Sequence, residues 1–245
     1  VKGHKIMLNM DKAALTASNC VPEKITECIG WWDTMNGWMH ELMGFNMDST
    51  YLRFNNLHVA RTKDDATTMS SGSYNTNYPP KSLAGMMSYE EMMDGCYFWG
   101  PAHEVGHANQ KAINMIGTTE VSNNLFSNVA IFYQDYFHTR GGTIADNCAA
   151  HRNGTAWHFR NSDSRMRMFY QLWLYYHAAG RNKNFYPKLF EYLRNDPMAI
   201  REATSGDVYT SGESLKFYKY ACRAAGEDLT PFFEAWGFFV PFSKT

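Results

Sequence analysis

Hydrophobic and polar positions change their spacing along this 245-residue chain, and the spacing predicts where strands and helices lie. Apolar residues alternate or run together over 4–10 and 51–61, as they do in strands. Over 22–45 they recur every three to four residues, as on one face of a helix. Residues 70–81 are rich in Ser, Asn, Gly, Tyr and Pro and are predicted to form a loop.

The rest of the chain has a mostly helical pattern. The predicted helices lie at 119–137, 164–179, 185–194, 212–225 and 230–236. We therefore predict an α+β fold, with a small strand-bearing part and one long helix over 1–95, and a mostly helical part over 96–245. No repeat or flexible linker separates these parts, so we expect a single domain over 1–245.

The sequence His-Glu-Val-Gly-His at 103–107 has the spacing of a metal site. Pro101 just before it predicts a helix start, since proline is tolerated in the first turn. Residues four apart lie on the same face of a helix, so His103 and His107 can bind one ion. Glu104 can reach a water on that ion and take its proton. This pattern predicts a zinc hydrolase, with one Zn²⁺ that activates water and polarises a carbonyl.

Glu120 is the candidate third ligand, because a catalytic zinc has three protein ligands and a structural zinc has four. It is separated from His107 by 12 residues (120 − 107 − 1). Gly117 is predicted to end the motif helix, and Thr118 or Thr119 to begin the next, so Glu120 falls in a first helical turn. Without the motif, Glu120 would be interpreted as an exposed carboxylate favoured by the helix dipole.

Asn124 lies one turn beyond Glu120 and is a candidate for supporting a ligand. Its amide oxygen could accept the outer N–H of a ligand histidine and so fix the tautomer of that ring. The same position also suits an ordinary solvated helix residue.

Peptide hydrolysis further needs a group that stabilises the oxyanion. His151, His158 and Arg160 lie in a stretch between predicted helices, where functional groups are common. The sequence does not choose among them, and each also suits an ordinary surface or hydrogen-bonded role.

Residues 99–107 (Trp-Gly-Pro-Ala-His-Glu-Val-Gly-His), Gln110 and residues 118–124 (Thr-Thr-Glu-Val-Ser-Asn-Asn) together resemble a known family. The family is that of the enhancin-like, mucin-degrading metallopeptidases, a gluzincin group with an HExGH motif and a downstream Glu. Residues 228–237 are also similar to the family's C-terminal segment. The resemblance is specific over 97–126, looser up to 242 and weak before 70.

The resemblance implies a zincin-like catalytic domain and a zinc endopeptidase for O-glycosylated, mucin-type proteins. His103, His107 and Glu120 would be the ligands and Glu104 the base. It also implies a secreted or cell-surface protein.

Tyr74 and Tyr78, in the segment before the motif, could face an extended substrate, because this segment commonly forms the upper rim of a zincin cleft. Tyr78-Pro79 looks like the family's pre-motif cleft segment. A tyrosine that anchors the loop on the core fits the sequence equally well.

Two alternatives stay open at this point. One is a broad-specificity zinc proteinase without glycan dependence, and the other is a glycan- or host-surface-binding module that retains the metal without turnover. Glu104 argues against the second, because a non-catalytic metal site has no use for a base.

Composition agrees with a catalytic domain and excludes some partners. The net charge is −1 and no basic run is present, so nothing favours nucleic acid or an anionic membrane. No apolar stretch reaches the ~20 residues of a transmembrane helix, and no signal peptide is expected. The five cysteines form no close metal-binding pair, although a Cys20–Cys28 bridge is conceivable. Oligomeric state cannot be inferred from the sequence.

Overall fold

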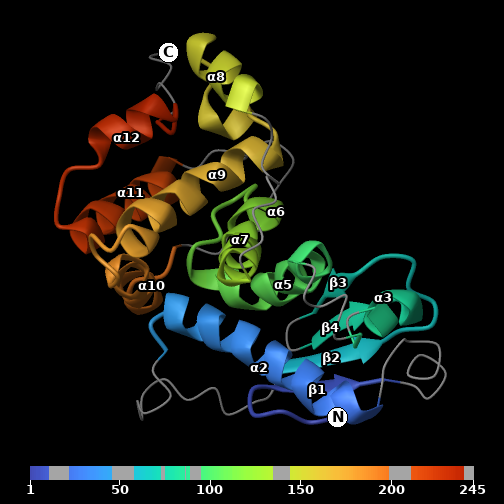
Figure 1. Cartoon of the computed structure of the whole chain (residues 1–245). Helices are drawn as coiled ribbons and strands as arrows, with labels where there is room; N and C mark the ends of the chain where they lie inside the picture. Colours follow the sequence, from blue (N-terminus) through green and yellow to red (C-terminus); the bar gives the residue numbers. More distant parts are fainter. Residues whose placement is uncertain are drawn as a thin grey trace. The chain divides into compact units, whose positions relative to one another are not determined.

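The computed structural model describes most of the chain (Figure 1). The described residues are 1–10, 22–45, 58–72, 75–85, 87–88, 95–134, 144–198 and 211–239. The chain divides into two compact units. Unit 1 comprises Val1–Gln110 and Phe126–His138, and unit 2 comprises Lys111–Leu125 and Thr139–Thr245. The single domain expected over 1–245, with its subdivision at 95, stays a prediction.

A four-stranded sheet forms the N-terminal part of unit 1. Its strands are β1 (Ile6–Asn9), β2 (His58–Thr62), β3 (Ser70–Ser71) and β4 (Asn75–Tyr78), in the order β1-β2-β4-β3. The first three in this order run parallel, and β3 is antiparallel to β4. A small mixed sheet followed by helices confirms the α+β class.

The polar segment 70–81 is where the sequence prediction was wrong. Most of it is not a loop, because β3 and β4 both lie within it, and α3 (Pro80–Gly85) begins at its end. β4 has hydrogen-bonded neighbours on both sides, so sheet pairing overrides its Asn-rich composition. The expected strand over 51–61 can be compared only at its end, since 51–57 lie outside the described residues.

The long helix predicted over 22–45 is confirmed as η1 (Pro22–Lys24) and α2 (Ile25–Leu42). Asp33 on α2 fixes the chain before β1: its carboxylate accepts the backbone N–H groups of His4 (2.6 Å), Lys5 (2.7 Å) and Ile6 (3.2 Å). A β-carbon at Gly3 would overlap this carboxylate, so a larger residue there would have to displace the Asp33 side chain.

The core of unit 1 is aromatic. Trp32 on α2 makes an edge contact with Tyr78, with ring centroids 6.0 Å apart, and its ring centroid lies 6.1 Å from that of Phe98 on α5 (Gly95–Asn109). All three side chains are fully buried. The buried thiol of Cys28 donates to the carbonyl of Met87 at 3.2 Å, and Cys20, with which a bridge was considered, lies outside the described residues.

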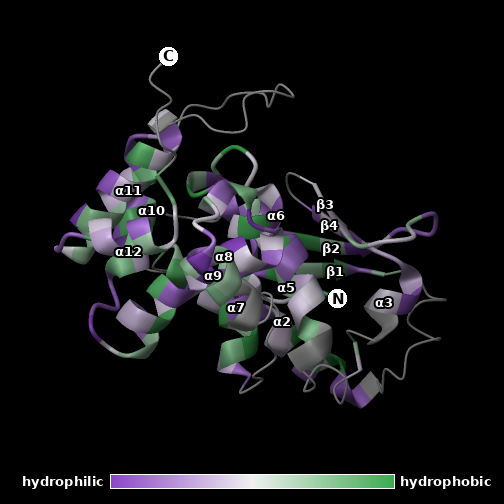
Figure 2. Ribbon diagram, turned by 90° about the horizontal axis from the view of Figure 1, so that it is seen from above, coloured by the Kyte–Doolittle hydropathy of each residue, from purple (hydrophilic) through white to green (hydrophobic). Residues whose placement is uncertain are grey.

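The helices after the sheet agree with the predicted pattern in kind but not at every boundary. They are α5, η2 (Gln110–Ala112), α6 (Thr119–Ser122), α7 (Asn124–Tyr133), α8 (Ile144–Arg152), η3 (Trp157–Phe159), α9 (Ser162–Trp173), the π-helical turn η4 (Leu174–Ala178), α10 (Phe185–Asn195), α11 (Ser211–Ala225) and α12 (Thr230–Ala235). Hydrophobic and hydrophilic residues alternate around these helices (Figure 2). On α10 the apolar face is buried and includes Phe185, Leu189 and Leu193.

Three boundaries differ from the prediction. Pro101 lies inside α5 rather than at its start, because the helix already begins at Gly95. Gly117, with a φ of +73°, lies in the turn after η2 rather than at the end of the motif helix. The helix expected over 119–137 is broken into α6 and α7, with non-helical backbone angles at Glu120.

Among the helices that the structure describes, none combines the length and apolar character needed to cross a bilayer.

Candidate metal centre

Helix α5 presents the two motif histidines one turn apart. The ring centroids of His103 and His107 are 4.8 Å apart and the rings are nearly perpendicular, at 87°. Both side chains are half-buried, whereas Glu104 between them is buried, with 8% of its surface exposed. The helical spacing inferred from the sequence is therefore present.

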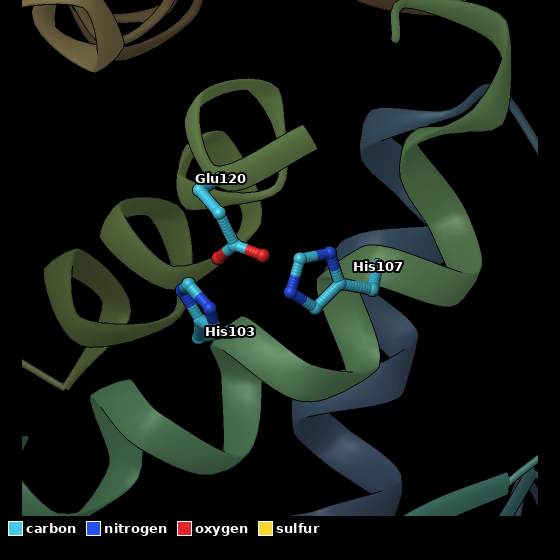
Figure 3. Close-up of side chains that lie close together, drawn as sticks. All are labelled: His103, His107 and Glu120. Atoms are coloured by element: carbon cyan, nitrogen blue, oxygen red, sulfur yellow. The ribbon is translucent and has the colours of Figure 1, made fainter. Parts of the chain in front are cut away.

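Glu120 contributes the third donor group. Its carboxylate oxygen and one ring nitrogen of each histidine all lie within 4.8 Å of one another. Figure 3 shows the carboxylate and the two imidazoles turned toward the same point. Two imidazoles and a carboxylate are a common donor set for catalytic zinc, so the chemistry of these side chains fits that ion. This is the only such cluster of His, Cys, Asp and Glu found among the described residues.

The turn that carries Glu120 is held by charged side chains from distant elements of unit 2. The Glu213 carboxylate on α11 accepts the backbone N–H of Ile116 at 2.9 Å, and Glu213 is only 7% exposed. Arg165 on α9 donates to the carbonyl of Gly117 at 2.9 Å. Thr118 caps the turn internally, donating to the carbonyl of Met115 at 2.7 Å. The backbone two to four residues before Glu120 is thus held by hydrogen bonds to an N–H group, at Ile116, and to a carbonyl group, at Gly117.

The His103 ring is held by an aromatic partner. Trp99, one turn earlier on α5, stacks on it with centroids 5.0 Å apart and planes 30° apart. The indole N–H of Trp99 donates to Asn128 on α7 at 3.4 Å, which limits rotation of the indole.

His107 has a different partner. Its Nδ1 lies 2.9 Å from the amide nitrogen of Gln110, three residues further along the chain. Trp99, Gln110, Glu213 and Arg165 were not assigned roles from the sequence. The sequence contained a signal only for Trp99, which is four residues before His103, and for Gln110, which is three residues after His107, because residues at these spacings are neighbours on a helix.

Tyr78 does not line a cleft in this structure. Its side chain is fully buried, and its hydroxyl faces the carbonyl of Pro101 at 3.5 Å. Burial raises the pKa of Tyr78 far above its usual value, and the nearby negative charge of Glu104 adds to that effect. Of the two roles expected for it, anchoring on the core is the one observed. Tyr74 lies outside the described residues.

Asn124 is buried and its amide nitrogen donates to the backbone carbonyl of Glu120 at 2.9 Å. This bond closes the helical turn that follows the candidate ligand. Support of a histidine by Asn124 stays a prediction.

The three candidates for oxyanion stabilisation each have a structural partner within unit 2. His151 Nδ1 is 2.8 Å from the carbonyl of Ala235. His158 stacks on Phe238 with ring centroids 5.9 Å apart, and burial, together with the charge of Arg165, lowers the pKa of His158 to about 4. Arg160 donates to the carbonyl of Thr155 at 3.1 Å and lies over the ring of Trp236 at 5.3 Å.

A helix-borne histidine pair with a buried glutamate between them, and a carboxylate from the next helix, defines the class: these are the groups of a zinc metallopeptidase. The particular family follows from comparison with known proteins. The chain belongs to the family described as peptidase M60, enhancin and enhancin-like, whose sequence profile matches residues 1–237. The resemblance seen in the motif is therefore confirmed over nearly the whole chain.

Solved structures agree with this family. A metallopeptidase in complex with Tn antigen is 35% identical, with a TM-score of 0.85 over 98% of this chain and 45% of its own. A metallopeptidase from Bacteroides thetaiotaomicron is 34% identical, with a TM-score of 0.85 over 98% of this chain and 41% of its own. The M60 catalytic domain of Clostridium perfringens ZmpC, solved with sialyl T antigen, is 19% identical, with a TM-score of 0.59 over 87% of this chain and 40% of its own, and shows the shared fold.

This chain spans less than half the length of the metallopeptidase solved with Tn antigen and of the metallopeptidase from Bacteroides thetaiotaomicron. No curated protein sequence matches it.

Proposed function

We propose that this chain is the catalytic part of a zinc-dependent endopeptidase that cleaves O-glycosylated, mucin-type glycoproteins outside the cell or at its surface. The observation that carries the proposal is the convergence of His103, His107 and Glu120, with their ligand atoms within 4.8 Å, in a chain of the peptidase M60 family.

His103, His107 and Glu120 would hold one Zn²⁺. When bound, this ion supplies a Lewis acid that polarises the scissile carbonyl and lowers the pKa of water to about 7. The chemistry of the donors supports zinc over the hard ions, because Mg²⁺ and Ca²⁺ take oxygen ligands rather than imidazoles.

Glu104 would act as the general base. It lies next to His103 on α5, and its buried position keeps bulk water away from the proton it handles. The carboxylate takes a proton from the attacking water and returns it to the leaving nitrogen, so that the amine departs neutral. A binding module that retains the metal without turnover would not need this residue.

The glycan part of the proposal rests on similarity. The metallopeptidase solved with Tn antigen is 35% identical over 98% of this chain, which supports an O-glycan as part of the substrate. Binding energy from such a sugar can orient the peptide carbonyl at the site, and a bare peptide lacks this contribution.

One experiment distinguishes the candidate functions. A mucin peptide and its deglycosylated twin are each incubated with the protein, with and without a chelator, and products are identified by mass spectrometry. Cleavage of the glycosylated peptide alone, lost with chelator and in Glu104→Gln, supports the proposal. Equal cleavage of both peptides points to a broad zinc proteinase, and binding without cleavage points to a glycan-binding module.

A further inference from the structure

His107 and Gln110 form a side-chain pair that is built into the end of the motif helix. The amide nitrogen of Gln110 lies 2.9 Å from His107 Nδ1. Gln110 is 2% exposed, so little water competes for this contact. Gln110 begins η2, the helical turn that directly follows α5. It is three residues after His107, and on a helix residues at this spacing lie side by side.

The two nitrogens of His107 have separate tasks. Nδ1 faces Gln110, and Figure 3 shows the other nitrogen of the ring pointing toward Glu120 and His103. A neutral imidazole carries one proton, so the nitrogen that binds a metal must be the unprotonated one. Nδ1 therefore has to carry the proton whenever Nε2 is a ligand, and that proton needs an acceptor.

A glutamine amide is suited to both states of this ring. With its nitrogen toward Nδ1 it donates to the ring, which leaves the proton on Nε2. After a half-turn of the amide, its oxygen accepts Nδ1–H and Nε2 is free to bind a cation. The geometry points to Gln110 as a positioning residue for His107, whose amide oxygen fixes the Nδ1-protonated tautomer and thereby raises the metal affinity of the site. This role rests on the proposed zinc function.

The contacts described for the two histidines restrain different properties of the rings. His103 is steadied by the stacked indole of Trp99, a contact that restrains ring orientation but sets no tautomer. The hydrogen bond at His107 Nδ1 does both. Loss of this bond leaves the ring free to populate the tautomer that cannot bind metal through Nε2.

Three variants test the role by their zinc dissociation constants, measured by competition with a chromogenic chelator on purified apoprotein. Gln110→Met keeps the length and volume of the side chain but has no hydrogen-bonding amide, so its dissociation constant should rise by ~10- to 100-fold, the usual effect of losing such a partner. Gln110→Glu keeps only the acceptor and should bind zinc at least as tightly as the parent protein.

Asn109→Leu is the matched control. Asn109 is a buried amide on the neighbouring position, but it contacts Met39 on α2 at 3.4 Å rather than a histidine. This variant should lose thermal stability as apoprotein while its zinc dissociation constant stays unchanged.

A second readout is independent of affinity. Long-range proton–nitrogen NMR of the imidazoles reports which ring nitrogen is protonated. In the zinc-loaded parent protein and in Gln110→Glu, His107 should carry its proton on Nδ1, with the N–H protected from exchange, and in Gln110→Met this protection should be lost. A Gln110→Met variant with parental zinc affinity and an unchanged spectrum overturns the inference. A parent protein that binds no zinc overturns the proposed function instead.

Discussion

A buried and a half-buried histidine should make unit 1 sensitive to acid. Burial lowers the pKa of His40, on α2, to about 4, helped by the charges of Lys5 and His58. Burial also lowers the pKa of His58, on β2, to about 4, and its Nε2 lies 3.1 Å from the Thr76 hydroxyl. In an unfolded chain both rings would titrate near their ordinary value of 6.5.

The sign follows from proton linkage. Between the folded pKa of about 4 and the unfolded value of 6.5, the unfolded chain binds more protons. The free energy of unfolding therefore keeps its full value above pH 6.5 and decreases as the pH falls toward 4. From pH 7 to pH 5 each of the two histidines should remove about 2 kcal/mol from the free energy of unfolding, from RT ln[(1 + 10^(pKa,U − pH))/(1 + 10^(pKa,N − pH))].

The assay is urea unfolding of the apoprotein, with chelator present so that metal release does not contribute, at pH 5, 6 and 7. His58→Gln keeps a polar atom for Thr76 but does not titrate, so its loss of stability between pH 7 and pH 5 should be about 2 kcal/mol smaller than in the parent protein. His4→Gln, at an exposed side chain, should keep the parental pH dependence. Hydrogen exchange of peptides from β1 and β2 assigns the effect to unit 1. The same pH dependence in His58→Gln and the parent protein would refute the reasoning.

Three further predictions concern the metal centre. Glu104→Gln keeps its shape but cannot accept a proton, so metal content should persist while kcat falls by ~10² or more; near-normal turnover means that another group is the base. Glu120→Ala should weaken zinc retention in dialysis much more than Glu104→Ala, because only Glu120 is a proposed ligand, and equal losses would show that the roles are assigned wrongly. Glu213→Leu removes the acceptor for Ile116 N–H and should lower both zinc affinity and melting temperature. Glu213→Gln keeps an acceptor and should recover most of the zinc affinity. Zinc titration of an equally destabilised variant away from this turn separates the effect on affinity from the effect on stability.

The sequence predicted the parts of the site that depend on local geometry. The spacing of His103 and His107 determines their common face once the segment is helical, and this could be inferred without any tertiary contact. The buried packing of Tyr78 could not, because its position depends on β4 entering the sheet between β2 and β3. The composition of 70–81 favoured a loop, and strand pairing with distant residues overrode it.

The position of Glu120 shows the same limit more sharply. Its turn is not a simple helix start, since Glu120 itself has non-helical backbone angles, with φ −92° and ψ 21°. The groups that fix this turn are Glu213 and Arg165, which lie 97 and 48 residues along the chain from their partners. A single sequence gives no reason to pair them with Ile116 and Gly117.

These long-range bonds also have a chemical consequence. A carboxylate on a free turn would lose conformational freedom on binding a metal, whereas one on a fixed turn has already lost much of it. Much of the ordering of Glu120 thus occurs when unit 2 folds, because the buried carboxylate of Glu213 binds the N–H of Ile116 and the guanidinium of Arg165 binds the carbonyl of Gly117. The histidines are ordered separately, by Trp99 and Gln110 within unit 1. Metal affinity in this chain should therefore respond to two independent sets of residues, one for the imidazoles and one for the carboxylate, and the free-energy effects of Gln110→Met and Glu213→Leu on zinc binding should add.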